Sequence, residues 1–143
     1  MNSPHIGDGG PEAFRAPYRI LVVDDNKDAA ESMGMLLQLL GGDVRTAHNG
    51  LEALDLAEHF LPHAIVLDIG LPKLDGFQAA RLIRAEDWGK NMVLLAVSGW
   101  CRAEDRQQSA DAGFDGHLAK PAPVQQIRNL IQGLLDRAAT GTA

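Results

Sequence analysis

The chain has 143 residues, a formal net charge of −6, 45% hydrophobic and 22% charged residues, and one cysteine. These values are typical of one globular domain that buries roughly two-thirds of its unfolded surface. The negative charge argues against direct binding of nucleic acid, because affinity for a duplex depends on neutralising its phosphates. A single cysteine excludes an internal disulfide, and no secretory signal or apolar run of about 18 residues is present. We therefore expect a cytoplasmic protein without a membrane segment.

Composition divides the chain into three parts. Residues 1–17 contain three glycines and three prolines and have no apolar periodicity, so we expect a flexible leader there. From residue 18 to residue 138, short apolar runs alternate with helical periodicity, which is typical of repeated βαβ units in one domain. Residues 139–143 are expected to fray.

The amino-terminal half of this domain predicts two strand–helix pairs. Residues 20–23 form an apolar strand, and the helix after it ends at Gly41–Gly42. A second strand over 44–47 is followed by the turn Asn49–Gly50 and a helix over 51–60. Periodicity places these side chains inward on the two helices: Met33, Leu36, Leu37 and Leu40, and then Leu51, Leu54 and Ala57.

The remaining elements complete the alternation. Strands over 64–68 and 92–97 are apolar along almost their whole length, as expected for strands covered on both faces. A helix beginning near Asp75–Gly76 lies between them and is expected to bury Phe77, Ala80 and Ile83. A polar helix over 102–112, a short strand over 117–119 and a strongly amphipathic last helix (Val124, Ile127, Leu130, Ile131, Leu134 and Leu135) follow. Five strands and five helices predict a doubly wound parallel α/β sheet.

Reactive side chains follow the predicted strands. Asp24 and Asp25 come after the first strand, Asp68 ends the third, Ser98 follows the fourth and Lys120 follows the fifth. Ligands of open parallel sheets bind outside the carboxyl ends of the strands, so these groups should meet at one edge.

Such a group of residues is suited to phosphoryl transfer. Three neighbouring carboxylates raise one another's pKa unless a cation is present, and Mg²⁺ suits a shallow oxygen site because it retains waters. Lys120 and Ser98 could then contact phosphoryl oxygens, while Asp68, the isolated carboxylate, acts as the nucleophile and becomes an aspartyl phosphate. Each residue alone has an ordinary alternative as a cap, turn or solvated surface residue, and only their joint occurrence favours a site.

The motifs resemble the receiver domain of two-component response regulators, of the chemotaxis-regulator type. The resemblance covers about residues 18–137 and rests on five segments: 20–26 (ILVVDDN), 65–72 (IVLDIGLP) with Asp75–Gly76, 96–99 (AVSG), 112–115 (AGFD) and 120–121 (KP). It implies a flavodoxin-like sheet with strand order 2-1-3-4-5.

The resemblance also implies roles for the site residues. Asp68 would accept a phosphoryl group from a histidine of a sensor kinase or a histidine phosphotransfer protein. Asp25, Asp68 and the main-chain carbonyl of Gly70 would bind Mg²⁺ directly, and Asp24 would bind it through a water. Ser98 and Lys120 would contact the phosphoryl oxygens.

In the family, the hydroxyl residue and an aromatic residue on the fifth strand form a switch that changes the surface of the fourth helix, fifth strand and fifth helix. Here the switch positions are Ser98 and His117. His117 is either a planar, pH-sensitive switch or a plain surface or half-buried histidine. Gly70 would leave the acyl phosphate open and Trp100 would shield it, so the phosphoryl lifetime is not predicted.

Two other functions fit parts of the pattern. A Mg-dependent phosphatase of the haloacid-dehalogenase type also uses strand-end carboxylates, but it usually carries Asp-x-Asp after its first strand. A flavodoxin-like nucleotide binder should carry a phosphate loop there, and residues 24–27 (DDNK) are too acidic for one. We therefore expect a phosphoacceptor rather than a turnover enzyme. It would be either a single-domain regulator or the receiver segment of a hybrid kinase, and it would act on a downstream protein that the sequence does not identify.

Overall fold

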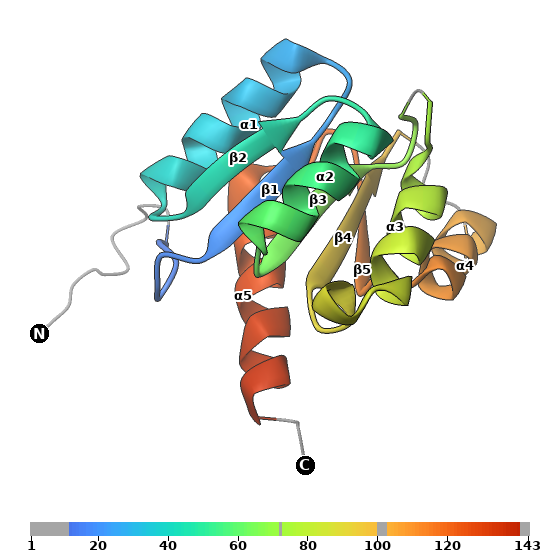
Figure 1. Cartoon of the computed structure of the whole chain (residues 1–143). Coiled ribbons are helices and arrows are strands. Elements are labelled where there is room, and N and C mark those ends of the chain that lie inside the picture. Colours follow the sequence, from blue (N-terminus) through green and yellow to red (C-terminus); the bar gives the residue numbers. More distant parts are fainter. Residues whose placement is uncertain (1–11, 72, 100–102, 141–143) are drawn as a thin grey trace, which may run out of the picture.

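The computed structural model describes residues 12–71, 73–99 and 103–140. Five parallel strands form one sheet in the order β2-β1-β3-β4-β5 (Figure 1). The strands are β1 (Arg19–Val23), β2 (Asp43–Ala47), β3 (Ala64–Asp68), β4 (Val93–Ser98) and β5 (Gly116–Ala119). The predicted flavodoxin-like topology is therefore confirmed.

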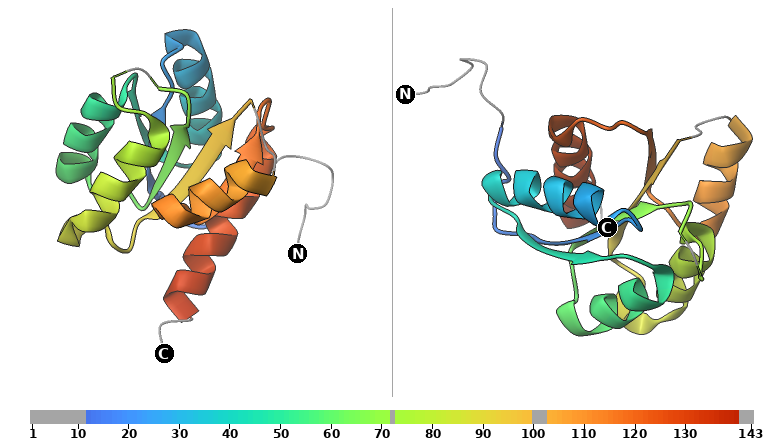
Figure 2. Two further views of the ribbon diagram at one scale, coloured as in Figure 1. Left: turned by 90° about the vertical axis from the view of Figure 1, so that its right-hand side faces the viewer. Right: turned by 90° about the horizontal axis from the view of Figure 1, so that it is seen from above.

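Helices cover both faces of the sheet, as the two turned views make clear (Figure 2). The five α-helices are α1 (Lys27–Leu39), α2 (Gly50–Phe60), α3 (Gly76–Ala85), α4 (Ala103–Ala112) and α5 (Val124–Thr140), and a short 3₁₀ helix, Asp87–Gly89, precedes β4. One core lies between the sheet and α2, α3 and the end of α4, and the other lies beneath α1 and α5. None of the helices in the described ranges has the length and hydrophobicity needed to cross a lipid bilayer.

Register along the sheet brings the reactive strand ends side by side. In the pairing of β3 with β4, Asp68 lies opposite Val97, and in the pairing of β4 with β5, Ser98 lies opposite Ala119. The amide of Lys120 then donates to the carbonyl of Ser98 at 2.7 Å. Because all strands run in one direction, their carboxyl ends share one edge, as predicted.

Helix faces differ from the predicted ones at two leucines. Leu36 on α1 and Leu51 on α2 were both expected inward, but they are 43% and 57% exposed. Small residues occupy the contact with the sheet instead: Ala30 and Gly34 on α1, Ala53 and Ala57 on α2. The buried face of α1 is therefore centred on Ala30, Gly34 and Leu37, and Leu36 lies beside this face. Phe77 is likewise half-buried rather than buried.

Residues 12–17, the last part of the predicted leader, pack against the domain, while residues 1–11 lie outside the described residues. Phe14 is 8% exposed and its amide donates to the carbonyl of Leu40 at the end of α1. On the other side, the guanidinium of Arg128 on α5 donates to the carbonyl of Ala13 at 2.8 and 3.1 Å. Burial of the aromatic ring and these backbone hydrogen bonds offset the conformational entropy lost on ordering.

Candidate functional site

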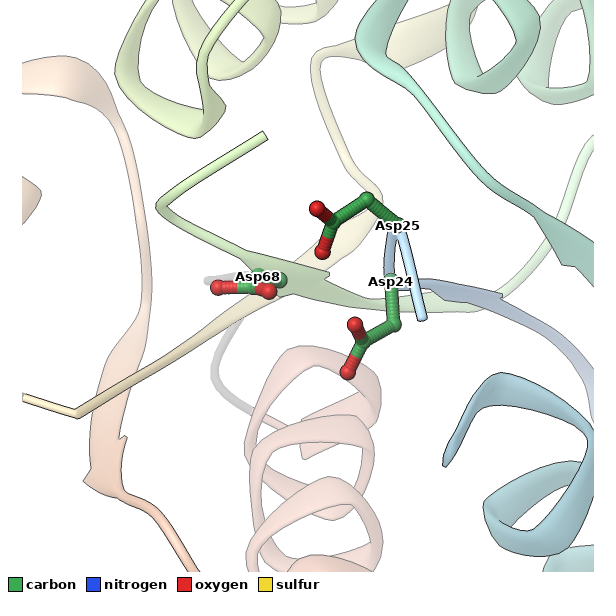
Figure 3. Close-up of side chains that lie close together, drawn as sticks. All are labelled: Asp24, Asp25 and Asp68. Atoms are coloured by element: carbon green, nitrogen blue, oxygen red, sulfur yellow. The ribbon is translucent and has the colours of Figure 1, made fainter. Parts of the chain in front are cut away.

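Three carboxylates converge at the carboxyl edge of the sheet (Figure 3). Asp68 is the last residue of β3 and is 8% exposed, whereas Asp24 is half-buried and Asp25 exposed in the loop after β1. One oxygen from each of the three lies within 4.8 Å of the others. The structure therefore brings together the three carboxylates that the sequence predicts at one edge.

Asn26 fixes the loop that carries the doublet. Its side-chain oxygen accepts from the amide of Ala29 and caps α1, and its own amide donates to Oδ1 of Asp24 at 3.0 Å. Asn26, and neither Asp24 nor Asp25, is therefore the N-cap of α1. Asp25 is left pointing toward the site rather than into the helix terminus (Figure 3).

Lys120 supplies the positive charge of the site. Its Nζ donates to Oδ2 of Asp68 at 2.9 Å and to Oδ2 of Asp24 at 3.3 Å. Partial burial lowers the pKa of Lys120, but the hydrogen bonds and charges of Asp68 and Asp24 outweigh it, so the pKa is raised above its ordinary value. Lys120 is accordingly protonated at neutral pH and partly neutralises the carboxylates.

The other oxygen of Asp68 is held by the backbone of the next loop. Oδ1 of Asp68 accepts a hydrogen bond from the amide of Gly70 at 3.1 Å. Together with Lys120 on Oδ2, this contact fixes the plane of the carboxylate at the end of the central strand. Gly70 itself is exposed.

Ser98 and His117 form the side of the site that faces α4. Ser98 is buried at the end of β4, and its Oγ lies 2.8 Å from Nε2 of half-buried His117 on β5. The opposite ring nitrogen, Nδ1, lies 2.9 Å from Oγ of Ser109 on α4. Sequence reasoning missed Ser109, which lies in a polar series and is one of the two buried residues of α4 together with Ala112. Trp100, the predicted shield, lies outside the described residues.

A cavity of about 280 Å³ opens beside the carboxylates. Asp24, Asp68 and Lys120 lie on its polar side, and apolar side chains such as Val66, Met33 and Ile127 line the rest. Asp68 therefore borders a cavity whose walls are largely apolar.

The donor set fits a hard divalent cation. Three carboxylates share the edge with one ammonium, so the site retains negative charge, and oxygen is the ligand atom that Mg²⁺ prefers. Asp25 is exposed enough for such an ion to keep several of its waters.

The profile of the response regulator receiver domain matches residues 20–132. The chain belongs to this family, and it is a receiver domain of the kind that operates in two-component signalling. Neither the strand order nor the sequence relatives support the alternative of a phosphatase of the haloacid-dehalogenase type.

Particular relatives agree with this assignment. Response regulator MprA of Mycobacterium sp. (strain KMS) is 36% identical over 123 residues, which are 86% of this chain and 53% of that protein. The chain thus spans about half the length of the MprA proteins that it matches. An uncharacterized 14.6 kDa protein of Leptolyngbya boryana is 35% identical over 117 residues, covering 82% of this chain and 89% of that protein.

Solved receiver domains share the fold. That of the sensor histidine kinase PA1611 from Pseudomonas aeruginosa, determined with a magnesium ion coordinated in its active-site cleft, has a TM-score of 0.77 and 31% identity. The match covers 85% of this chain and 99% of that one. A CheY-like receiver domain protein from Methanospirillum hungatei has a TM-score of 0.79 and 26% identity, over 88% of this chain and 99% of that one.

Proposed function

We propose that Asp68 is the phosphoacceptor of this receiver domain. One observation supports the assignment above the others: Asp68 is the buried carboxylate at the end of the central strand, and Lys120 contacts the oxygen Oδ2 at 2.9 Å. An ammonium there neutralises charge that develops on the transferred group, which is the main requirement of phosphoryl transfer.

The proposed reaction is a displacement at phosphorus. A carboxylate oxygen of Asp68 bonds to the phosphorus of a phosphohistidine, the phosphorus–nitrogen bond breaks, and the imidazole leaves with its electron pair and takes up a proton. The product is an acyl phosphate on Asp68, which water can later hydrolyse to restore the carboxylate. Lys120 and the Ser98 hydroxyl donate to the phosphoryl oxygens.

Mg²⁺ fits the same edge of the sheet and, when bound, neutralises charge on the phosphoryl oxygens. Asp25, Asp68 and the main-chain carbonyl of Gly70 would hold it directly, and Asp24 through a water. The magnesium in the cleft of the related PA1611 receiver domain supports this proposal.

The donor would be a sensor histidine kinase or a histidine phosphotransfer protein, and the acceptor of the signal a downstream protein. The apolar wall of the cavity beside Asp68 suits contact with a protein donor, while the net charge of −6 disfavours direct contact with nucleic acid. We further propose that the chain acts in the cytoplasm and does not turn over phosphate esters.

The test is chemical mapping of the modified residue. The protein is incubated with acetyl phosphate and Mg²⁺, the acyl phosphate is reduced with borohydride, and the altered residue is located by peptide mass spectrometry. We expect modification at Asp68, none in Asp68→Asn, and unchanged modification in Asp87→Asn, whose carboxylate is on the surface. Labelling of Asp68→Asn to the extent of the parent protein would refute the assignment.

A further inference from the structure

Three side chains form a continuous polar chain from the site to α4. It runs from Oγ of Ser98 to Nε2 of His117 at 2.8 Å, and from Nδ1 of His117 to Oγ of Ser109 at 2.9 Å. Ser98 and Ser109 are 7% and 2% exposed, and His117 is half-buried between them. Both distances are within the range of well-formed hydrogen bonds.

Ser109 is unusual for its place on α4. The other buried residue of this helix is Ala112; Asp105 is half-buried and the remaining α4 residues are exposed. An alanine would fill a tight contact with the sheet without a polar atom, whereas a buried hydroxyl costs free energy unless it is hydrogen-bonded. The hydroxyl of Ser109 therefore needs a partner, and the imidazole of His117 is that partner.

The proton of the imidazole decides what Ser98 can do. A neutral imidazole carries its hydrogen on one nitrogen and accepts on the other. If Nε2 carries the hydrogen, it donates to Oγ of Ser98, and the imidazole then makes no demand on the hydroxyl hydrogen of Ser98, which can turn toward a phosphoryl oxygen. If Nδ1 carries the hydrogen, Nε2 accepts the hydroxyl hydrogen of Ser98, which then cannot donate to the phosphoryl group.

We propose that Ser109 is a positioning residue for phosphoryl transfer, acting on Ser98 through His117. The hydroxyl of Ser109 donates to Nδ1 and thereby keeps the hydrogen on Nε2, so that Ser98 presents its own hydrogen to the phosphoryl oxygens. This role rests on the proposed function, because it needs Asp68 to be the acceptor.

The same hydrogen bonds couple the site to α4. If Ser98 moves toward a phosphoryl group, His117 either follows it and strains the bond to Ser109 or remains and loses Ser98. In the first case the change reaches α4 through the polar contact of His117 with Ser109. A phenylalanine at position 117 could not make this contact, because a phenyl ring has no nitrogen to accept from Ser109.

Two measurements test the inference. The first is the tautomer of His117, obtained from long-range ¹H–¹⁵N correlation spectra of the histidine-labelled full chain, which requires no phosphorylation. We expect the Nε2–H form in the parent and a mixture in Ser109→Ala. The second is the initial rate of phosphorylation by acetyl phosphate with Mg²⁺. This rate should fall about fivefold in Ser109→Ala, which is the effect expected from losing one ordinary hydrogen bond.

Control variants separate positioning from a merely structural role. Ser109→Thr retains the hydroxyl and should restore both the tautomer and the rate, while Ser32→Ala removes an exposed serine from α1 and should change neither. An Nδ1–H tautomer in the parent would overturn the inference, as would an unchanged tautomer and rate in folded Ser109→Ala. Failure of the parent to be labelled at Asp68 would instead refute the proposed function.

Discussion

At the scale of single residues, the one ammonium group of the site does not neutralise its three carboxylates. Lys120 contacts Asp68 and Asp24, whereas the cluster of three carboxylates also includes Asp25, which is exposed. Like charges within about 5 Å repel one another even near the surface. A divalent cation would relieve this repulsion, and the three carboxylates should contribute to its affinity unequally.

Substitution of Asp24 and Asp25 should show which of them binds Mg²⁺ directly and which binds it through a water. Asp25→Ala is expected to abolish measurable Mg²⁺ binding, because it removes a proposed ligand from a site with few others. Asp24→Ala should weaken binding only on the order of tenfold, the usual effect of a residue that acts through a bound water. Calorimetric titration of Mg²⁺ measures both, with Asp28→Ala on α1 as a control. Equal affinities for Asp25→Ala and the parent would contradict the proposed ligand set.

Lys120 predicts a specific dependence of stability on pH. Its pKa is raised in the folded protein above the ordinary 10.5. The ion pairs therefore stabilise the fold below that ordinary value, and their contribution is lost as the pH rises through the raised pKa. In urea unfolding, the difference between the parent and Lys120→Met should be constant from about pH 7 to about pH 9 and shrink only above that range. A difference that already vanishes near neutral pH would contradict the assigned pairing.

At the scale of elements, the hydrogen bonds of one arginine join three segments. Arg84 at the end of α3 donates to the carbonyls of Gly89 and Met92 before β4, to the carbonyl of Gly113 after α4, and to the carboxylate of Asp115 at 2.8 Å. The same Asp115 carboxylate accepts from the amide of Leu94 on β4. The far end of the molecule, opposite the site, is thus fixed by a planar group with several donors.

Removal of this group should destabilise the domain without touching the site. Arg84→Ala leaves several carbonyls without their donor, so we expect a loss of roughly 2–3 kcal/mol in the free energy of unfolding. Arg84→Lys should not restore it, because an ammonium cannot reach the same set of acceptors. Urea unfolding gives the values, and Arg81→Ala, an exposed position on the same helix, is the control. Parent-like stability of Arg84→Ala would show that these contacts contribute little.

The segment of residues 12–17 also connects elements, because it contacts both the end of α1 and α5. Phe14 packs edge-on against Tyr18 with ring centroids 6.0 Å apart. The guanidinium carbon of Arg128 lies 6.0 Å from the centroid of the Phe14 ring. Gln132 on α5 accepts from the amide of Arg15 and donates to the hydroxyl of Tyr18. The buried polar residues of α5 therefore bind the segment that precedes β1.

Truncation of the buried ring should reveal this role. Phe14→Ala is expected to lower the free energy of unfolding by about 3 kcal/mol, the lower end for a buried phenylalanine, because the site lies near the surface. Phe14→Leu should recover most of the loss. Thermal unfolding followed by circular dichroism measures the effect, and Gln38→Ala, at an exposed position on α1, is the control. A change of less than the experimental error in Phe14→Ala would mean that residues 12–17 are not a stable part of the domain.

At the scale of the whole molecule, the fold and the carboxylates were predictable because their signals are local in the sequence. Alternating apolar runs define the strands, and a carboxylate directly after a strand lies at the edge of the sheet wherever that strand pairs. Phe14 and Ser109 were not predictable in this way. Their burial depends on partners on α5 and β5 that only the folded chain brings near. Leu36 and Leu51 fit the helical period of the apolar residues, but they lie beside the buried face of their helix and are exposed.

The two faces of the sheet should respond differently to phosphorylation. α4 buries Ser109 and Ala112, whereas α5 buries Ile127 and Ile131 and is also bound to the segment of residues 12–17. A helix with few buried side chains opens at lower free energy than one that is well packed. A change at Ser98 should therefore spread through His117 to α4 and leave α5 in place.

Hydrogen exchange with and without beryllofluoride, a phosphoryl mimic, measures this response across the chain. We expect altered protection over residues 103–119 and unchanged protection over residues 124–135, with no change in Asp68→Asn. The reason is the asymmetry of the two layers: the polar chain through His117 ends on the loosely held helix, whereas buried isoleucines hold α5 against the sheet. Changes restricted to the loops at Asp25, Asp68 and Lys120 would show that His117 does not transmit the signal. The domain would then act as a phosphoryl store or relay rather than as a conformational switch.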